Sequence, residues 1–250
     1  DSQAFLILML IIHGCNRQVP RLVSLELLAK IAALVDYYQC LEAVEVFAGL
    51  WLQRLRSQRQ LPEQVGRDLI LWLFISWVFA NGDIFTSVTT IALRQSQGPL
   101  PTLGLPIPEK IIEAIDRRRQ EVVEKVTTAL HGLCVSFRDS PDQCCFECSS
   151  IQLGALTKEM HAKRLEPRPA SPMLGYSVVA TIDTARSFRS PQWDCKRRGY
   201  RYASRYCDLE SIIRSKVDGL KEMIRGLKLG DFQERRSPVA SDGLGATAAA

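Results

Sequence analysis

Apolar residues recur at helical spacing along most of the chain, and this pattern predicts a mainly α-helical fold. Residues 2–12 are apolar over nearly their whole length, and residues 25–38 follow Ser24, a residue type that often begins helices. Residues 40–58 repeat the pattern with one continuous apolar face. The side chains of that face are Val44, Phe47, Trp51 and Leu55. No segment shows the two-residue alternation that is typical of a half-buried strand.

The longest uncharged stretch, residues 69–82, forms most of a fourth helix that we predict over residues 62–80 and continues into the turn after it. Pro62 suits the first turn of this helix, and the Asn81–Gly82 pair is expected to end it. The stretch is shorter than the roughly 20 apolar residues that a membrane span needs, so we interpret it as a buried core helix. Its aromatic side chains are expected in the core, and an aromatic groove for a partner peptide is the alternative. These residues, with one from the preceding helix, are Trp51, Trp72, Phe74, Trp77 and Phe79.

Proline-rich connections separate the remaining predicted helices, and residues 97–110 are the longest such connection before the centre of the chain. Further helices are predicted over residues 84–96 (capped by Asp83), 109–133 (opened by Pro108), 178–190 (capped by Ser177) and 207–232. Another helix is expected to begin near residue 143, after a loop over residues 135–143. The small, polar residues beyond 232 indicate a disordered tail.

Composition places the chain among globular proteins, with 46% hydrophobic and 24% charged residues. The net charge of +5 is too small and too dispersed to favour a dedicated nucleic-acid binder. The chain has no initiator Met and opens on an apolar helix without the basic start of a signal peptide, so we expect a fragment of a longer protein. A reducing intracellular compartment, cytoplasmic or nuclear, is therefore expected, with no membrane partner and no disulfides.

Several motifs together carry a family resemblance. The N-terminal part reads as an apolar helix ending in "IIHG", a "VP" loop, a Leu-rich helix and "DYYQC". The later motifs are "GRDLILWLFISWVF", "LGLPIPEK", "CCFECSSIQLGALTK", "RSFRSP" and "GLKLGDF". On these motifs, which cover most of residues 2–232, the chain resembles a group of filamentous-fungal proteins that contain a BTB/POZ domain.

This resemblance implies a domain organisation and a kind of function. Residues 1–57 would be the C-terminal helices of a BTB/POZ domain whose sheet lies upstream, residues 58–232 an all-α helical module, and residues 233–250 a disordered tail. BTB/POZ domains are interaction modules that dimerise or recruit partners such as cullin-type ubiquitin ligases. We therefore expect a non-catalytic protein–protein interaction module, an adaptor or dimerisation protein, that binds a protein partner or itself.

Three of the eight cysteines lie within residues 144–148, and helical phase suggests which of them share a face. In a helix beginning near residue 143, Cys144 and Cys148 are one turn apart, while His131 and Cys134 share a face of the preceding helix. If the loop folds the two helices back on each other, these four side chains converge. Structural zinc requires such a set of four Cys or His ligands.

The family resemblance shifts the emphasis among the cysteines. It implies a C-x3-C motif at Cys144 and Cys148 and a matching cysteine at Cys207, whereas Cys145 and Cys134 depart from the family pattern. The candidate ligands of a structural zinc are thus Cys144, Cys148, Cys207 and His131. Two alternatives stay open: buried free thiols that pack as small apolar groups, and reactive thiols beside a helix end.

The sequence gives little support to catalysis. It contains no Gly-rich phosphate loop and no G-x-S-x-G nucleophile motif, and its three histidines are few for imidazole chemistry. Asp36 is interpreted as a structural hydrogen bonder rather than a functional acid. The run at residues 195–207 mixes basic and aromatic side chains, so a nucleic-acid-associated regulatory protein is the alternative function; a solvated loop is the simpler interpretation.

Overall fold

The computed structural model describes residues 1–139, 145–193 and 208–233, and every regular element within these ranges is a helix. The predicted mainly α-helical fold is therefore confirmed. The α-helices are α1 (Ser2–Ile12), α2 (Leu25–Tyr38), α3 (Leu41–Gln58), α4 (Arg67–Val78), α5 (Gly82–Gln95), α6 (Glu109–Asp139), α7 (Phe146–Ala162), α8 (Val178–Arg186) and α10 (Leu209–Val217). Two short 3₁₀ helices follow, η1 (Asp218–Met223) and η2 (Leu229–Asp231).

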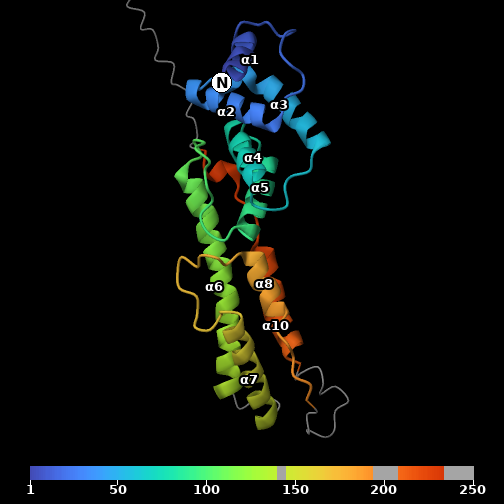
Figure 1. Ribbon diagram of the computed structural model, residues 1–250, viewed down its shortest axis with the longest axis vertical. Coiled ribbons are helices and arrows are strands. Elements are labelled where there is room, and N and C mark those ends of the chain that lie inside the picture. The colour runs from blue at the N-terminus through green and yellow to red at the C-terminus, as the bar shows by residue number, and fades with distance from the viewer. Residues whose placement is uncertain (140–144, 194–207, 234–250) are drawn as a thin grey trace, which may run out of the picture.

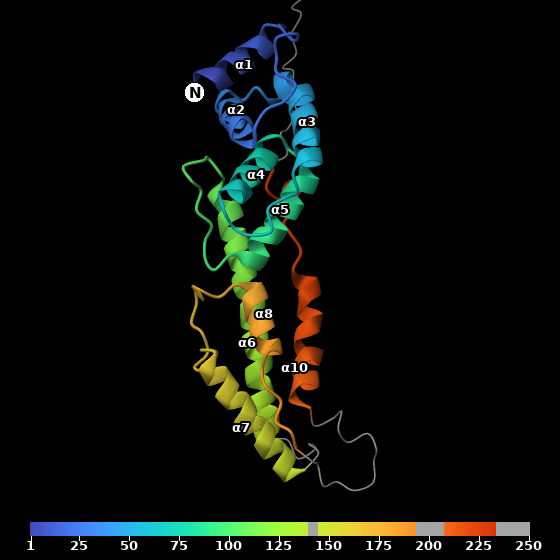
Figure 2. The same cartoon turned by 45° about the vertical axis from the view of Figure 1, so that its right-hand side comes forward.

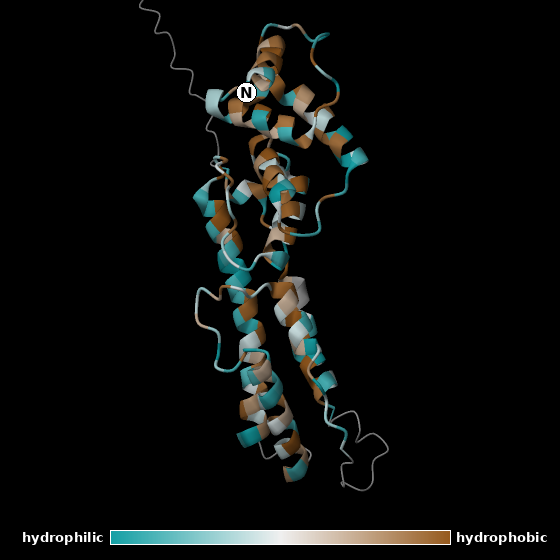
Figure 3. Cartoon of the chain, in the orientation of Figure 1, coloured by the Kyte–Doolittle hydropathy of each residue, from teal (hydrophilic) through white to brown (hydrophobic). Residues whose placement is uncertain are grey.

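The molecule is elongated, and its helices fall into two zones joined through α4 and α5 (Figures 1 and 2). Helices α1, α2 and α3 form one end and pack against each other, and α2 also packs against α4. The long helix α6 runs away from this end, and α7, α8 and α10 lie along it. Figure 3 shows hydrophobic residues over much of α1 and α4, whereas hydrophilic residues recur along α6. The predicted domain boundary at residue 57 stays a prediction.

The predicted N-terminal helices are confirmed almost to the residue. The Ser24 hydroxyl accepts a hydrogen bond from the Leu27 amide and so begins α2, as its residue type predicts. The expected apolar stripe of α3 is buried, with Trp51 completely so. The Trp51 indole N–H donates to the Pro20 carbonyl at 2.8 Å, which satisfies its one polar atom.

The start of α4 and the cap of α5 differ from the prediction. Helix α4 begins at Arg67, not at Pro62, because the chain is fully extended at Gly66 (φ −167°, ψ −175°) and cannot continue a helix through it. It ends at Val78, and the left-handed Ala80 (φ 51°) makes the turn. The cap of α5 is Asn81, whose Oδ1 accepts from the Ile84 amide at 3.0 Å, rather than Asp83.

The ends of α6, α8 and the last helix and the start of α7 were predicted wrongly, α8 ending at Arg186 instead of residue 190. Helix α6 continues through residues 134–139, which were expected in a loop, because Cys134 and Phe137 prolong its buried face. The single helix predicted over residues 207–232 ends at Val217 and gives way to η1 and then to non-helical chain. The start of α7 is Phe146 with Cys145 as its cap, later than the predicted position near residue 143. The predicted tail lies, from residue 234 on, outside the described residues.

Residues 224–233, here called the C-terminal strap, run back along α5 towards the N-terminal helices (Figure 2). The Thr86 hydroxyl donates to the Leu227 carbonyl at 3.0 Å, and the Leu227 amide donates to the Thr89 hydroxyl at 2.9 Å. At Gly226 the strap lies so close that a Cβ atom would be 2.0 Å from the Thr86 carbonyl oxygen. Only glycine fits this contact, which holds the strap directly against α5.

Arg119 of α6 holds the connection between α7 and α8. Its side chain is fully buried, and both Nε and Nη2 lie 2.8 Å from the same carboxylate oxygen of Asp116. The guanidinium also donates to three main-chain carbonyls of the connection, at distances of 2.8 to 2.9 Å. The acceptors belong to Pro172, Met173 and Tyr176. A loop without regular structure is thereby fixed to the central helix.

Candidate functional site

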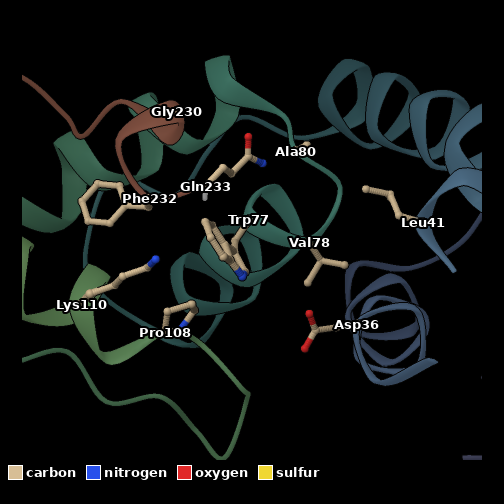
Figure 4. Close-up of a pocket in the computed structure, with 10 residues that line it drawn as sticks. All are labelled: Asp36, Leu41, Trp77, Val78, Ala80, Pro108, Lys110, Gly230, Phe232 and Gln233. Atoms are coloured by element: carbon tan, nitrogen blue, oxygen red, sulfur yellow. The ribbon is translucent and has the colours of Figure 1, made fainter. Parts of the chain in front are cut away.

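A groove of about 800 Å³ lies where the N-terminal helices, α4, the start of α6 and the strap meet (Figure 4). Its volume is within the range of roughly 300–1,000 Å³ that is typical of ligand sites. The walls come from segments far apart in the sequence: Asp36 from α2, Leu41 from α3, Trp77 from α4, Lys110 from α6 and Phe232 from the strap. The groove therefore exists only once the strap has packed against α5.

The apolar part of this groove centres on Trp77. The predicted core position is confirmed for Trp51, Trp72 and Phe74, which are buried, whereas Trp77 and Phe79 are only partly buried. Trp77 lines the groove, with Phe232 beyond it in the close-up view (Figure 4). The Phe232 ring also packs against Phe85 of α5, with 6.2 Å between the ring centroids, so its position is supported from behind. Of the five aromatic residues, Trp77 lines this groove, which corresponds to the alternative interpretation of an aromatic groove.

Two charged side chains line the groove at different helix ends. Asp36 lies in the last turn of α2, and Lys110 lies in the first turn of α6. They lie on opposite sides of Trp77, so one side of the groove is negative and the other positive (Figure 4). The sequence interpretation of Asp36 as a structural hydrogen bonder stays a prediction, and its place at the groove depends on the packing of segments that are distant in sequence.

A second exposed feature lies on α1 and α2, and we call it the α1–α2 patch. It consists of Phe5, Ile12, Tyr37 and Tyr38. Phe5 and Ile12 are 42% and 47% exposed, and Tyr37 and Tyr38 are 78% and 53% exposed. The rings of Phe5 and Tyr38 are 6.4 Å apart, and those of Tyr37 and Tyr38 meet edge to face at 5.0 Å. The rings of Phe5, Tyr37 and Tyr38 therefore form one contiguous aromatic surface. Ile12 lies on the same face of α1 as Phe5 and extends the apolar surface along that helix.

His131, one of the proposed zinc ligands, has partners at both ring nitrogens. Its Nδ1 lies 3.2 Å from the Glu166 carboxylate, and its Nε2 lies 3.1 Å from the Leu165 carbonyl oxygen. Both nitrogens are occupied by residues that follow α7, so the ring fixes the end of that helix to α6. A metal ion at either ring nitrogen would have to displace the oxygen atom that now lies next to it.

The cysteines that the structure describes behave as buried or partly buried groups. The Cys145 sulfur accepts from the Cys148 amide at 3.5 Å and caps α7, while Cys148 is buried. The Cys134 sulfur lies 3.7 Å from the Met160 sulfur, which confirms that α7 folds back on α6. Burial raises the pKa of the Cys134 thiol, so this thiol stays protonated at neutral pH. Cys134 thus acts as a small apolar group in the α6–α7 contact.

Of the four predicted zinc ligands, Cys148 and His131 lie within the described residues. Across residues 1–139, 145–193 and 208–233, no group of three or more His, Cys, Asp or Glu side chains could hold a metal ion. Cys144 and Cys207 lie outside these ranges, as does the whole basic and aromatic run at residues 195–207. The zinc set of Cys144, Cys148, Cys207 and His131 therefore stays a prediction.

Among the described helices, none is both long and apolar enough to cross a membrane.

Neither family models, nor curated proteins, nor solved structures match this chain. The BTB/POZ resemblance consequently stays a prediction from the sequence motifs, and function has to be argued from the groove and the α1–α2 patch.

Proposed function

We propose that this protein is a non-catalytic protein–protein interaction module whose α1–α2 patch binds a second copy of the chain. The observation that carries the proposal is the exposure of four large apolar side chains on neighbouring helices. Contiguous exposed apolar surface is the usual mark of a contact site on a globular protein. Tyr and Phe are enriched at such contacts because their rings bury much area at a small cost in side-chain entropy.

A second copy is favoured as the partner because the patch has no net charge. The patch contains no Asp, Glu, Lys or Arg, and on the same two helices Asp1, which caps α1, forms an ion pair with Lys30 of α2 at 2.6 Å. This pair leaves both signs of charge balanced beside the patch. In a two-fold dimer the same surface meets itself, so a patch of one sign would repel its copy. The α1–α2 patch avoids that repulsion.

Two further considerations support an interaction role. The family resemblance implies a domain that dimerises or recruits partners. The groove presents one carboxylate, Asp36, and one ammonium group, Lys110, on opposite sides of an indole. An enzyme needs titratable groups that converge on one reacting atom, and this arrangement separates them.

The test is the molar mass in solution, measured by light scattering over a wide range of protein concentration. The wild-type chain is expected to approach the mass of a dimer as concentration rises, and Tyr38→Asp is expected to stay monomeric because a buried carboxylate without a partner is costly. Val46→Asp is the matched control, since Val46 is 83% exposed on α3 and belongs to no such cluster. It should dimerise like the wild type.

The far-ultraviolet circular dichroism of both variants should match that of the wild type, which shows that each is folded. A wild-type chain that remains monomeric at every concentration would refute self-association through this patch. Equal dimerisation of the wild type and Tyr38→Asp would refute the assignment of the contact to α1 and α2.

A further inference from the structure

The groove has an apolar centre and one cationic side. Trp77 and Phe232 line its centre, and Lys110 lines the side that the start of α6 forms. The Lys110 side chain extends towards Trp77 (Figure 4). Lys110 is exposed, and it takes part in none of the salt bridges found among the described residues. Its ammonium group can therefore pair with an anion that enters the groove.

The amino end of α6 adds positive charge on the same side. Pro108, which directly precedes this 31-residue helix, has no side-chain oxygen that could cap the first amide groups. Such a helix end carries a partial positive charge of roughly half an elementary charge. Pro108 lines the groove together with Lys110, whereas Glu109, the acidic residue of this turn, does not. The helix end and the ammonium group therefore favour the same kind of ligand, an anion.

The carboxylate of Asp36 takes no part in this site. Asp36 lies on the other side of Trp77 from Lys110 (Figure 4), and it already has an interaction of its own within the protein. The lining residues between these two sides are mostly apolar and include Leu41, Val78 and Phe232. The groove thus suits a ligand with one anionic group at the α6 side and an apolar body beside Trp77.

We propose that this groove binds a small carboxylic acid that has a single carboxylate and an apolar body. The carboxylate pairs with Lys110, and the apolar body packs against Trp77 and Phe232. Among the described residues that line the groove, Lys110 is the one cation, and this matches a ligand with one negative charge. A phosphate monoester is a poorer match, because it carries about two negative charges at neutral pH and one of them would stay unpaired.

The architecture around the groove favours a small ligand over an extended peptide. An extended peptide is commonly held by main-chain hydrogen bonds to the edge of a sheet. Every regular element in residues 1–139, 145–193 and 208–233 is a helix, so the walls of the groove offer no such edge. A volume of about 800 Å³ can instead take up the whole of a small acid. The proposal goes beyond self-association, because it uses other side chains and a different partner.

The experiment measures binding of small acids to the full-length chain by isothermal titration calorimetry at neutral pH. The probes are phenylbutanoate, naphthylacetate and octanoate, and the control for each is its uncharged primary amide. At least one acid is expected to bind about threefold more tightly than its amide or better, and the difference should shrink as salt is added. If no acid binds more tightly than its amide, the proposal is wrong.

Variants of Lys110 then assign the contact. Lys110→Ala is expected to weaken binding of the acid about two- to fivefold, the range for a partly exposed ion pair, and to leave binding of the amide unchanged. Lys110→Arg keeps the charge and should retain most of the affinity for the acid. Lys216→Ala, which removes an exposed lysine of α10, is the matched control and should change neither affinity. Equal losses for acid and amide in Lys110→Ala would overturn the assignment.

Two other occupants are tested in the same way. An acetylated tetrapeptide that ends in a free phenylalanine carboxylate presents the same chemistry as part of a polypeptide. If it binds more than tenfold more tightly than every small acid, the groove takes a protein terminus and the proposal is overturned; weaker binding supports it. The chain's own Glu234 directly follows Gln233 of the groove. Glu234→Gln should leave the affinity for the acid unchanged, and a clear gain would mean that this carboxylate occupies the site instead.

Discussion

Replacing Arg119 with alanine tests how the α7–α8 connection is held to α6. The guanidinium is fully buried, so no water is in position to take over its hydrogen bonds without rearrangement. The substitution leaves the Asp116 carboxylate, itself almost fully buried, without its cation. It also leaves the carbonyls of Pro172, Met173 and Tyr176 without their donor.

The expected loss in the free energy of unfolding is about 3–5 kcal/mol, the usual cost of breaking a buried ion pair by removing one partner. The three orphaned carbonyls would add about 1–3 kcal/mol each if they stayed dry. The connection lies at the surface, however, so we expect it to open and let water reach these carbonyls. The net figure therefore stays close to that of the ion pair alone, and the connection becomes more mobile.

The assay is urea unfolding followed by circular dichroism at neutral pH. Arg117→Ala is the matched control, because Arg117 is exposed two residues earlier in α6 and makes only a long ion pair with Glu121, at 3.8 Å. It should change the free energy of unfolding by less than about 0.5 kcal/mol. Removing Asp116 as well should restore part of the loss, since no unpaired carboxylate then remains. A loss below about 1 kcal/mol for Arg119→Ala would refute this account of the connection.

Three more predictions follow from single contacts. Gly226→Ala should lower the free energy of unfolding, measured in urea, by about 1–3 kcal/mol, because its Cβ would lie 2.0 Å from a main-chain oxygen of α5. Gly219→Ala is the control, since a Cβ at Gly219 would have no atom within 4 Å. Equal losses for the two variants would contradict the tight strap contact. Hydrogen bonds from the hydroxyls of Ser211 and Ser190 lower the pKa of Asp208 in the folded protein. The stability that this carboxylate contributes is therefore complete above its unfolded pKa of about 3.9, and it is lost as the pH falls through the lower folded pKa. Asp208→Asn should therefore make the free energy of unfolding fall less steeply as the pH is lowered. An unchanged dependence on pH would contradict this role of the Asp208 carboxylate. Because burial raises the pKa of the Cys134 thiol, iodoacetamide should alkylate it far more slowly in the native protein than in urea, as measured by mass spectrometry, and equal rates would argue against its burial.

Local signals in the sequence were sufficient for the N-terminal helices. The bounds of α1 and α2 match the prediction, because a helix begins where a capping side chain stands and continues while its apolar positions keep one face. Ser177 shows the same for α8, since its hydroxyl accepts from the Ala180 amide. Each of these signals lies within a few residues of the feature that it predicts.

The wrong predictions occur where a distant contact outweighs a local preference. Pro62 is a good first-turn residue, yet the chain stays non-helical up to Gly66, and the helix α4 that begins after it packs against α2 and α5. The pattern over residues 207–232 is amphipathic, yet Gly226 packs directly on Thr86 of α5. The Thr86 hydroxyl also donates to the carbonyl of Leu227, which lies 141 residues later in the chain. Neither contact leaves a trace in the spacing of the apolar residues nearby.

The candidate site divides in the same way. Trp77 could be recognised from the sequence as an aromatic residue with two interpretations, core or groove, but its exposure could not be decided there. Asp36, Lys110 and Phe232 come from α2, α6 and the strap, and only the packing of these segments brings them to one groove. The α1–α2 patch likewise depends on the close approach of Phe5 and Tyr38.

The sequence by itself determined that this chain is helical, where most helices begin and which faces they bury, because these properties depend on neighbours three or four residues apart. The tertiary structure alone decided where α6, α8 and α10 stop, which aromatic side chains stay exposed and which charges share a groove. Those properties depend on contacts between segments that are distant in sequence, where close packing at residues such as Gly226 overrides the local pattern.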